Sequence, residues 1–326
     1  MRFLLASILV LCACGARTEL GGTLRGGGGG ATCTKSPWVV FDYNAAGQGF
    51  VLAAIRADGS DFHLLGIDGF LPSVSPDGAS LLYVSGSPEG DESFVLRDLA
   101  SGQTRTIVHQ TVPPQSSGYG KSAISPDGKW IAYGDSPDLH VVRFDGSGDE
   151  FLVPGPYDAG CCSWSYGHPV FSADSSLIYF STIGILESIR PDGSGLTLLA
   201  QDQFFSGSGN YPGFVFPNAS LSPDGKKIVA QVACDASELR VFDAPTAPFD
   251  PCGAGTKLVE TGVSESGNEA SNPSWGPTDL IVYDDGPDIL TIPAAGGAKT
   301  NLTSALTGGG KNAADPVWAS GCANVP

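Results

Sequence analysis

The sequence predicts an all-β fold, a six-bladed β-propeller in which every blade is a four-stranded antiparallel sheet. A nine-residue phrase occurs twice in nearly the same form, as SPDGKWIAY at 125–133 and SPDGKKIVA at 222–230. A third copy starts at Ser75 and a degenerate fourth at Ser172, so that successive aspartates of the phrase lie 50, 47 and 50 residues apart. A fixed period of this length indicates one supersecondary unit that is used repeatedly. The 45 Gly and 24 Pro also divide the 326 residues into short segments, which is typical of a β protein.

Each unit contains four short apolar runs separated by turn-forming residues. In the third unit the runs cover 122–125, 130–133, 139–144 and 149–153. The turns between them contain Asp-Gly, which suits a tight turn because Gly adopts positive φ and Asp accepts hydrogen bonds from its own backbone. We therefore expect the repeated aspartates to be structural rather than catalytic. They are Asp77, Asp127, Asp174 and Asp224.

The other units repeat this order, and no amphipathic helix is predicted. Second strands are expected at 81–84, 130–133, 177–180, 228–231 and 280–283. Third strands are expected at 94–99, 139–144, 185–190, 238–243 and 288–292. Fourth strands are expected at 104–108, 149–153, 196–199, 256–259 and 300–302.

The two ends of the repeat region predict how the ring closes. The segment 38–43 matches a second strand and is followed by strands at 51–57 and 62–65, so the first unit lacks its opening strand. The segment 315–320 matches the opening strand of the sixth unit, 272–277. We therefore expect the C-terminal strand to complete the first blade, which closes a six-bladed ring and removes exposed sheet edges.

The phrase Ser-Pro-Asp-Gly-Lys before an apolar strand, followed by an Asp-Gly-Ser turn, resembles the repeat of TolB-type six-bladed propellers. The resemblance covers roughly 37–320. We expect two departures from the protein that gives this family its name: no separate N-terminal α/β domain before the propeller, and a lipid anchor. The resemblance implies the fold, and fold alone does not imply a role in an envelope complex.

The N-terminus resembles that of a bacterial lipoprotein. Met1-Arg2 precedes a short apolar run, 3–11, that is too brief for a permanent membrane span. The run ends at Leu11-Cys12-Ala13-Cys14, which resembles a lipobox, whose last cysteine is acylated; an ordinary signal peptide cleaved elsewhere is the alternative. We expect a signal peptide at 1–13, a lipidated Cys14 with a Gly-rich tether at 14–36, and the propeller at 37–322. The residue after the cysteine, Gly15, indicates the outer membrane by the same resemblance, facing the periplasm or the cell surface.

The six remaining cysteines predict disulfide bonds, because an even number in an exported chain usually pairs. The repeat map favours Cys33 with Cys322 at the two ends, and Cys234 with Cys252 inside one unit. The adjacent Cys161 and Cys162 would form a vicinal disulfide or stay reduced. A zinc site is the rival interpretation, but no cysteine pair has the spacing of zinc ligands and no histidine completes one. No metal or cofactor is predicted.

Charge and motifs exclude several functions. With 17 basic and 34 acidic residues the net charge is −17, which repels nucleic acid and anionic lipid. The sequence has no Gly-x-Ser-x-Gly elbow, His-Glu-x-x-His pair, Walker loop or EF-hand loop. Two acidic groups, Asp284-Asp285 with Asp288 and Asp149-Glu150, could bind Ca²⁺ or serve a glycosidase, but they lack a spacing signature.

Recognition is expected on one face of the ring. Because strand direction alternates, the Asp-Gly turns share one face, and the long loops 109–120, 154–167, 200–217 and 260–271 share the other. Aromatic side chains are frequent in these loops and could anchor a partner, although they could also fold back onto the propeller. The predicted partner-binding aromatics are Tyr119, Trp164, Tyr166, Phe205, Tyr211 and Phe214.

One residue of each blade is expected at the mouth of the central channel on the same face. These six residues are Leu71, Lys121, His168, Asn218, Asn272 and Asp315. We expect them to be mainly solvated polar groups, although their charges and amides could hold a ligand or a cation. Lys121, His168 and Asp315 are included in the predicted binding surface.

The functional hypothesis is a non-catalytic, monomeric envelope lipoprotein that binds an envelope protein or peptide through its loop-rich face. It would contact the membrane only through its lipid anchor. The alternative is a carbohydrate-active or lyase-type propeller enzyme with its site at the channel mouth.

Overall fold

A computed structural model describes most of the chain from residue 36 onward. The described residues are 36–45, 49–86, 91–111, 119–135, 138–154, 157–158, 162–163, 167–182, 185–201, 219–233, 237–261, 270–308, 311–319 and 325. The chain divides into two units, Met1–Thr32 and Cys33–Pro326, and all described residues belong to the second. Within these ranges the regular structure is entirely β, and they contain no helix long and apolar enough to cross a membrane.

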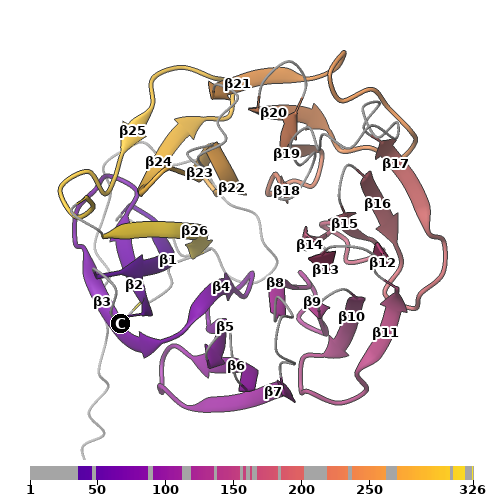
Figure 1. Ribbon diagram of the computed structural model, residues 1–326, viewed down its shortest axis with the longest axis horizontal. Coiled ribbons are helices and arrows are strands. Elements are labelled where there is room, and N and C mark those ends of the chain that lie inside the picture. Colours follow the sequence, from indigo (N-terminus) through magenta and orange to yellow (C-terminus); the bar gives the residue numbers. More distant parts are fainter. Residues whose placement is uncertain are drawn as a thin grey trace, which may run out of the picture. The chain divides into compact units, whose positions relative to one another are not determined.

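Six four-stranded antiparallel sheets surround one axis and form the blades of a propeller (Figure 1). Blade 1 consists of β26 (Asn312–Ala319), β1 (Trp38–Asn44), β2 (Phe50–Arg56) and β3 (His63–Asp68). Blade 2 consists of β4 (Phe70–Val74), β5 (Ser80–Gly86), β6 (Asp91–Asp98) and β7 (Thr104–Thr111). Blade 3 consists of β8 (Tyr119–Ile124), β9 (Trp130–Asp135), β10 (Asp138–Arg143) and β11 (Glu150–Val153).

The remaining three blades follow the same order from the axis outward. Blade 4 consists of β14 (Gly167–Phe171), β15 (Ile178–Thr182), β16 (Ile185–Ile189) and β17 (Thr197–Gln201). Blade 5 consists of β18 (Ala219–Leu221), β19 (Lys227–Ala233), β20 (Ser237–Asp243) and β21 (Thr256–Thr261). Blade 6 consists of β22 (Ala270–Trp275), β23 (Leu280–Asp285), β24 (Asp288–Pro293) and β25 (Thr300–Asn301).

The C-terminal strand closes the ring as predicted. β26 pairs antiparallel with β1, with Trp38 opposite Ala319 and Asn44 opposite Asn312. One small sheet was not predicted: β12 (Tyr157–Asp158) pairs with β13 (Cys162–Ser163) inside the segment that the sequence indicates as a loop.

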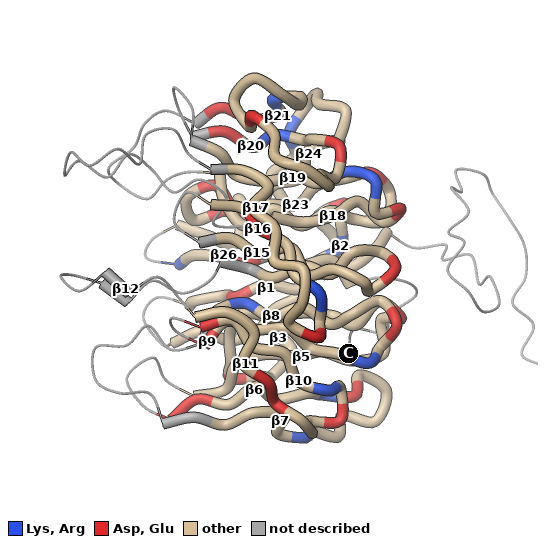
Figure 2. Tube along the Cα trace, turned by 90° about the vertical axis from the view of Figure 1, so that its right-hand side faces the viewer, with Lys and Arg blue, Asp and Glu red and all other residues tan. Residues whose placement is uncertain are grey.

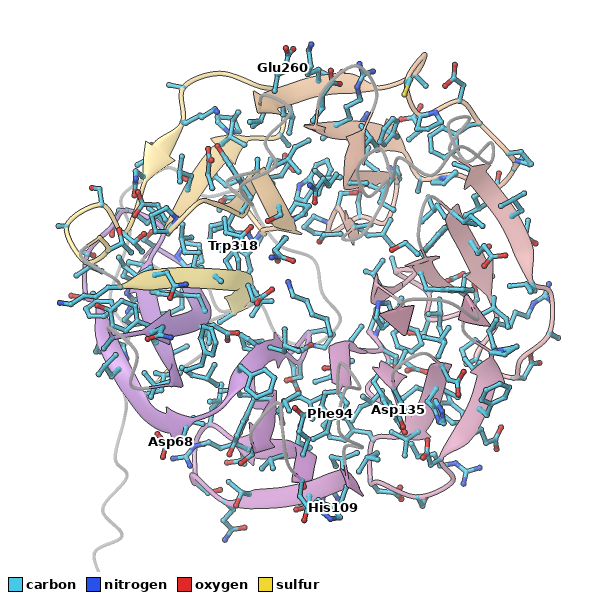
Figure 3. The ribbon with its side chains drawn as sticks, viewed as in Figure 1. Asp68, Phe94, His109, Asp135, Glu260 and Trp318 are labelled. Atoms are coloured by element: carbon cyan, nitrogen blue, oxygen red, sulfur yellow. The ribbon has the colours of Figure 1, made fainter. Side chains whose placement is uncertain are left out.

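The hydrophobic core lies between blades. Among the described residues it divides into six clusters, and each cluster is formed by two neighbouring blades. Between blades 2 and 3, the rings of Phe94 and Tyr133 meet edge to face at 5.2 Å. Between blades 6 and 1, Trp318 donates from Nε1 to the Ser274 carbonyl at 2.8 Å (Figure 3). Burial of a large apolar side chain contributes about 2 kcal/mol, so each blade depends on its neighbours for stability.

A β-bulge interrupts the innermost strand of five blades, where the pairing of the first two strands shifts register. Four of these bulges contain a proline preceded by a predicted channel residue: Leu71-Pro72, His168-Pro169, Asn272-Pro273 and Asp315-Pro316. Proline has no N–H to donate, so it is tolerated where the ladder is broken. The residue before proline has a left-handed φ in three of them, 53° for Leu71, 51° for Asn272 and 54° for Asp315.

The turn face comprises the turns between first and second strands and between third and fourth strands. In the Ser-Pro-Asp-Gly turn of blade 3, Ser125 Oγ donates to Asp127 Oδ1 at 2.7 Å and accepts from the Trp130 N–H at 2.9 Å. The Asp-Gly-Ser turn is similar, because Asp145 Oδ1 accepts from both the N–H and the Oγ of Ser147. The structural role predicted for the repeated aspartates is confirmed. In Figure 2 the turn face is on the right-hand side, where acidic and basic residues occupy many of the turns.

Candidate functional site

Five polar side chains from blades 1, 3 and 6 meet near the axis. They lie at the end of the ring opposite the turn face, and we call this end the loop face. We call this set the axial polar cluster. It consists of Asp42 on β1, Lys121 on β8, Asn272 on β22, Asp284 on β23 and Asp315 on β26. The β-bulges position three of them, because Lys121, Asn272 and Asp315 all lie where an innermost strand shifts register.

Lys121 connects blade 3 to blades 6 and 1. Its Nζ donates to Asn272 Oδ1 at 3.0 Å and forms an ion pair with Asp315 Oδ1 at 2.8 Å. The side chains of Lys121 and Asp315 are only 10% and 19% exposed. The carboxylate and amide oxygens take the place of water around this ammonium, which offsets the cost of burying its charge.

Asp284 accepts hydrogen bonds from three donors. Ser271 Oγ donates to Oδ1 at 2.5 Å, and Asn272 Nδ2 donates to Oδ2 at 2.7 Å. The backbone N–H of Asp315 also donates to Oδ2, at 3.2 Å. Asp284 thus satisfies a backbone N–H that the bulge on β26 leaves without a ladder partner.

Asp42 has the equivalent role between blades 1 and 2. Both of its carboxylate oxygens lie 3.1 Å from the N–H of Leu71, which begins the bulge on β4. Asp42 and Asp284 occupy equivalent positions near the ends of the second strands of their blades, and each binds the bulged amide of the next blade. These two aspartates therefore connect neighbouring blades at the axis.

Burial and mutual repulsion perturb both of these carboxyls. Burial, followed by the nearby Asp315 carboxylate, raises the pKa of Asp42 well above its ordinary value, and the Leu71 N–H and Lys121 only partly oppose this. Burial and Asp315 also raise the pKa of Asp284, against Asn272, Ser271 and Lys121. The strand register places Asp42 opposite Ala314, the neighbour of Asp315, so the Asp42 and Asp315 carboxyls lie close together. Three carboxyls around one ammonium retain a proton more readily than isolated ones.

The acidic pairs noted in the sequence do not converge. Asp284 faces the axial polar cluster, whereas Asp288 accepts from Asn301 Nδ2 at 2.8 Å and from Thr307. Asp149 accepts from Tyr133 Oη at 2.7 Å and lies 3.4 Å from His140 Nδ1. The described residues contain no group of His, Cys, Asp and Glu side chains arranged to hold a metal ion.

The predicted channel residues have different outcomes. Lys121, Asn272 and Asp315 are brought together. Lys121 is buried, so the expectation that it is solvated is wrong, whereas Asn272 and Asp315 stay partly exposed while they contact Lys121. Leu71 contributes its backbone N–H. The side chains of Tyr119 and His168, together with Asn218, Trp164, Tyr166, Phe205, Tyr211 and Phe214, lie outside the described residues, as do Cys14, Cys33, Cys234 and Cys322. The disulfide proposed for Cys252 therefore stays a prediction.

Sequence reasoning missed Asp42 altogether and assigned Asp284 to a different kind of site. The available signal was the repeated residue-Pro pair at the start of the innermost strands, which marks the bulges. A bulged amide needs an acceptor, and a polar residue near the end of the preceding blade's second strand can supply it.

Comparisons with known proteins identify the fold. No family model matches the chain, and no curated protein matches its sequence. A solved structure of TolB from Acinetobacter baumannii superimposes with a TM-score of 0.63 at 18% identity, covering 89% of this chain and 68% of that one. A chain of a nidogen–laminin complex superimposes with a TM-score of 0.59 at 12% identity, covering 86% of this chain and 98% of that one. The chain thus has the TolB-like six-bladed propeller fold.

Proposed function

We propose that this protein is a non-catalytic binding scaffold of the bacterial envelope, and that it engages a protein or peptide partner through its loop face. The observation that carries the proposal is the contrast between the two faces of the ring. On the turn face, the carboxylates are engaged by their own turns. On the loop face, charged groups from several blades converge around the axis.

The charge of the axial polar cluster favours a partner segment that carries a cation. Three carboxyls lie around the single ammonium of Lys121, and burial, followed by repulsion from the Asp315 carboxylate, raises the pKa values of Asp42 and Asp284. A lysine, arginine or free amino group of a partner near Asp315 would reduce this repulsion. The same fold in a chain of a nidogen–laminin complex also supports the proposal, because a propeller of this kind exists there in a protein complex.

The envelope location depends on the N-terminal sequence. Cleavage before Cys14 and acylation of that cysteine would attach the propeller through the tether at 14–36, with the outer membrane as the expected site. Mass spectrometry of the mature N-terminus would show a lipid-modified Cys14. A mature chain that starts at another residue would contradict the anchor without affecting the binding proposal.

The binding proposal is tested by capture from detergent-solubilised envelopes with three versions of the protein. The loop-face variant is Trp164→Ala/Tyr211→Ala, and the matched control is Lys129→Ala/Lys226→Ala, two turn-face lysines that are 72% and 80% exposed. We expect wild type and control to recover the same partner and the loop-face variant to lose it, with direct binding then measured on the purified pair. Failure to recover any partner, or equal loss with the control, would overturn the proposal.

The alternative is a carbohydrate-active or lyase-type enzyme at the axis. A carboxyl with a raised pKa next to a carboxylate is an arrangement that acid–base catalysis uses, and Asp42 with Asp315 provides one. Against this, Asp42 is 2% exposed and its oxygens are engaged by the Leu71 N–H. Turnover of an envelope glycan that Asp315→Asn or His168→Ala abolishes would favour the enzyme.

A further inference from the structure

We propose that the axial polar cluster is a proton-sensitive latch that holds the closing strand β26 in the ring. The chain is continuous within blades 2 to 6, whereas blade 1 is completed by the pairing of β26, from the far end of the chain, with β1, and among the described residues this closure is non-covalent. Release of this strand would open the ring without breaking any other sheet. The latch goes beyond the proposed binding function and does not depend on it.

Asp315 is the point on β26 where the cluster acts. Its side chain pairs with Lys121 of blade 3 at 2.8 Å, and its backbone N–H donates to Asp284 of blade 6 at 3.2 Å. It also lies beside Asp42 of blade 1, because Asp42 is paired with Ala314, the preceding residue of β26. One residue of the closing strand is thus bound by three different blades.

A proton determines whether the contact between Asp42 and Asp315 attracts or repels. When Asp42 is protonated, its hydroxyl can donate to the Asp315 carboxylate, and Asp315 keeps its ion pair with Lys121. When Asp42 is ionised, two carboxylates face each other in a buried site. Undocking of β26 removes Asp315 and admits water, so Asp42 gives up its proton more readily in the open ring.

The sign of the pH dependence follows from this difference. The pKa of Asp42 is higher with β26 docked, so docking is strongest at low pH and weakens as the pH rises through the raised value. Asp284 contributes in the same direction, because its pKa is also raised. The described groups that face Asp42 and Asp315 are Asp284, Lys121, Asn272, Ser271 and the Leu71 N–H.

Hydrogen exchange of the full-length protein in detergent tests the latch. Exchange is followed between about pH 4 and about pH 8 and corrected for the intrinsic rate, with reductant present so that a Cys33–Cys322 bond cannot hold the strand. We expect protection of the β26 amides to fall as the pH rises, by at most about tenfold per pH unit for one proton. Protection of the β15 amides, in the opposite blade, should not fall in this way as the pH rises.

Asp42→Asn separates the latch from general stability, because asparagine keeps an acceptor for the Leu71 N–H and cannot ionise. In this variant, protection of β26 should depend on pH much less than in wild type, with the remainder due to Asp284, and should exceed that of wild type at the alkaline end. Asp68→Asn is the matched control, since Asp68 is an exposed residue at the end of β3 in the same blade (Figure 3). The series is repeated with His168→Gln, so that a histidine titration is not mistaken for that of Asp42.

Two outcomes would overturn the proposal. One is an unchanged pH dependence of β26 in Asp42→Asn, which would show that another group titrates. The other is a parallel loss of protection in β15, which would show that the whole protein responds rather than the closing strand.

Discussion

The turn face and the axial polar cluster both rely on aspartate, but they place it in opposite environments. Asp127 and Asp174 are exposed, and their pKa values are lowered. For Asp127, burial is the largest single influence and acts to raise the pKa, but hydrogen bonds from Ser125 and Lys129 together outweigh it; for Asp174, hydrogen bonds from Ser172 and Ser176 dominate. Asp42 and Asp284 are buried, and desolvation together with Asp315 raises their pKa values. The same side chain therefore stabilises a local turn in one region and connects separate blades in the other.

The difference lies in how far apart in sequence the partners are. The aspartates of the turns bond to residues two positions away, such as Ser125 and Lys129 for Asp127. Lys121 and Asn272 are 151 positions apart and meet only because the ring closes. A turn can form before the rest of the chain has folded, whereas the axial polar cluster requires complete blades.

The comparison is tested most strongly by removing one aspartate from each region. Asp284→Ala should destabilise the protein by about 3 kcal/mol, because it leaves the donors on Ser271, Asn272 and Asp315 without their acceptor. Asp224→Ala should cost only about 1 kcal/mol, because its turn is exposed to water. Urea unfolding at neutral pH measures both values, and equal losses would remove the distinction between the two regions.

The fold was predictable because its signals are local and periodic. The repeated phrase located β9 and β19 to within a few residues, and the missing opening strand of the first unit predicted the pairing of β26 with β1. Each Ser-Pro-Asp-Gly copy contains its own turn chemistry. Short segments of sequence were therefore sufficient to predict the architecture.

The candidate site was only partly predictable. Alignment of the opening strands correctly selected Lys121, Asn272 and Asp315, because equivalent positions in a propeller lie at the same level of the ring. It could not show that the Lys121 side chain crosses to blades 6 and 1, nor that Asp42 and Asp284 complete the set from the second strands. These contacts depend on the radius of the closed ring, which no single repeat encodes.

A second prediction concerns how much change the turns tolerate. Gly128 and Gly225 occupy the same turn position with φ of 68° and 69°, so alanine at either site is strained by about 1 kcal/mol. A Cβ on Gly128 would meet nothing within 4 Å, whereas one on Gly225 would lie 2.6 Å from Cβ of Ala173. Gly225→Ala should therefore cost about 2 kcal/mol or more, and Gly128→Ala about half of that. Thermal unfolding of the two variants gives the order, and the reverse order would show that contacts between blades do not constrain the turn face.

The smallest effect should be a pH dependence opposite in sign to that of Asp42. Hydrogen bonds from Ser172, and then from the side chain and N–H of Ser176, lower the pKa of Asp174 to about 2. A lowered pKa means that this turn contributes its stability above the ordinary aspartate pKa of about 3.9 and loses it as the pH falls toward about 2. Asp174→Asn keeps an acceptor without the charge, so the stability difference between wild type and variant should shrink on acidification. It should stay below about 1 kcal/mol, because water screens an exposed group. Urea midpoints of wild type and Asp174→Asn, measured from about pH 2 to about pH 6, test this prediction. Over the same range, the stability of Asp42→Asn relative to wild type should increase as the pH rises. If the relative stabilities of both variants changed with pH in the same direction, the two regions would not differ in how they hold their protons.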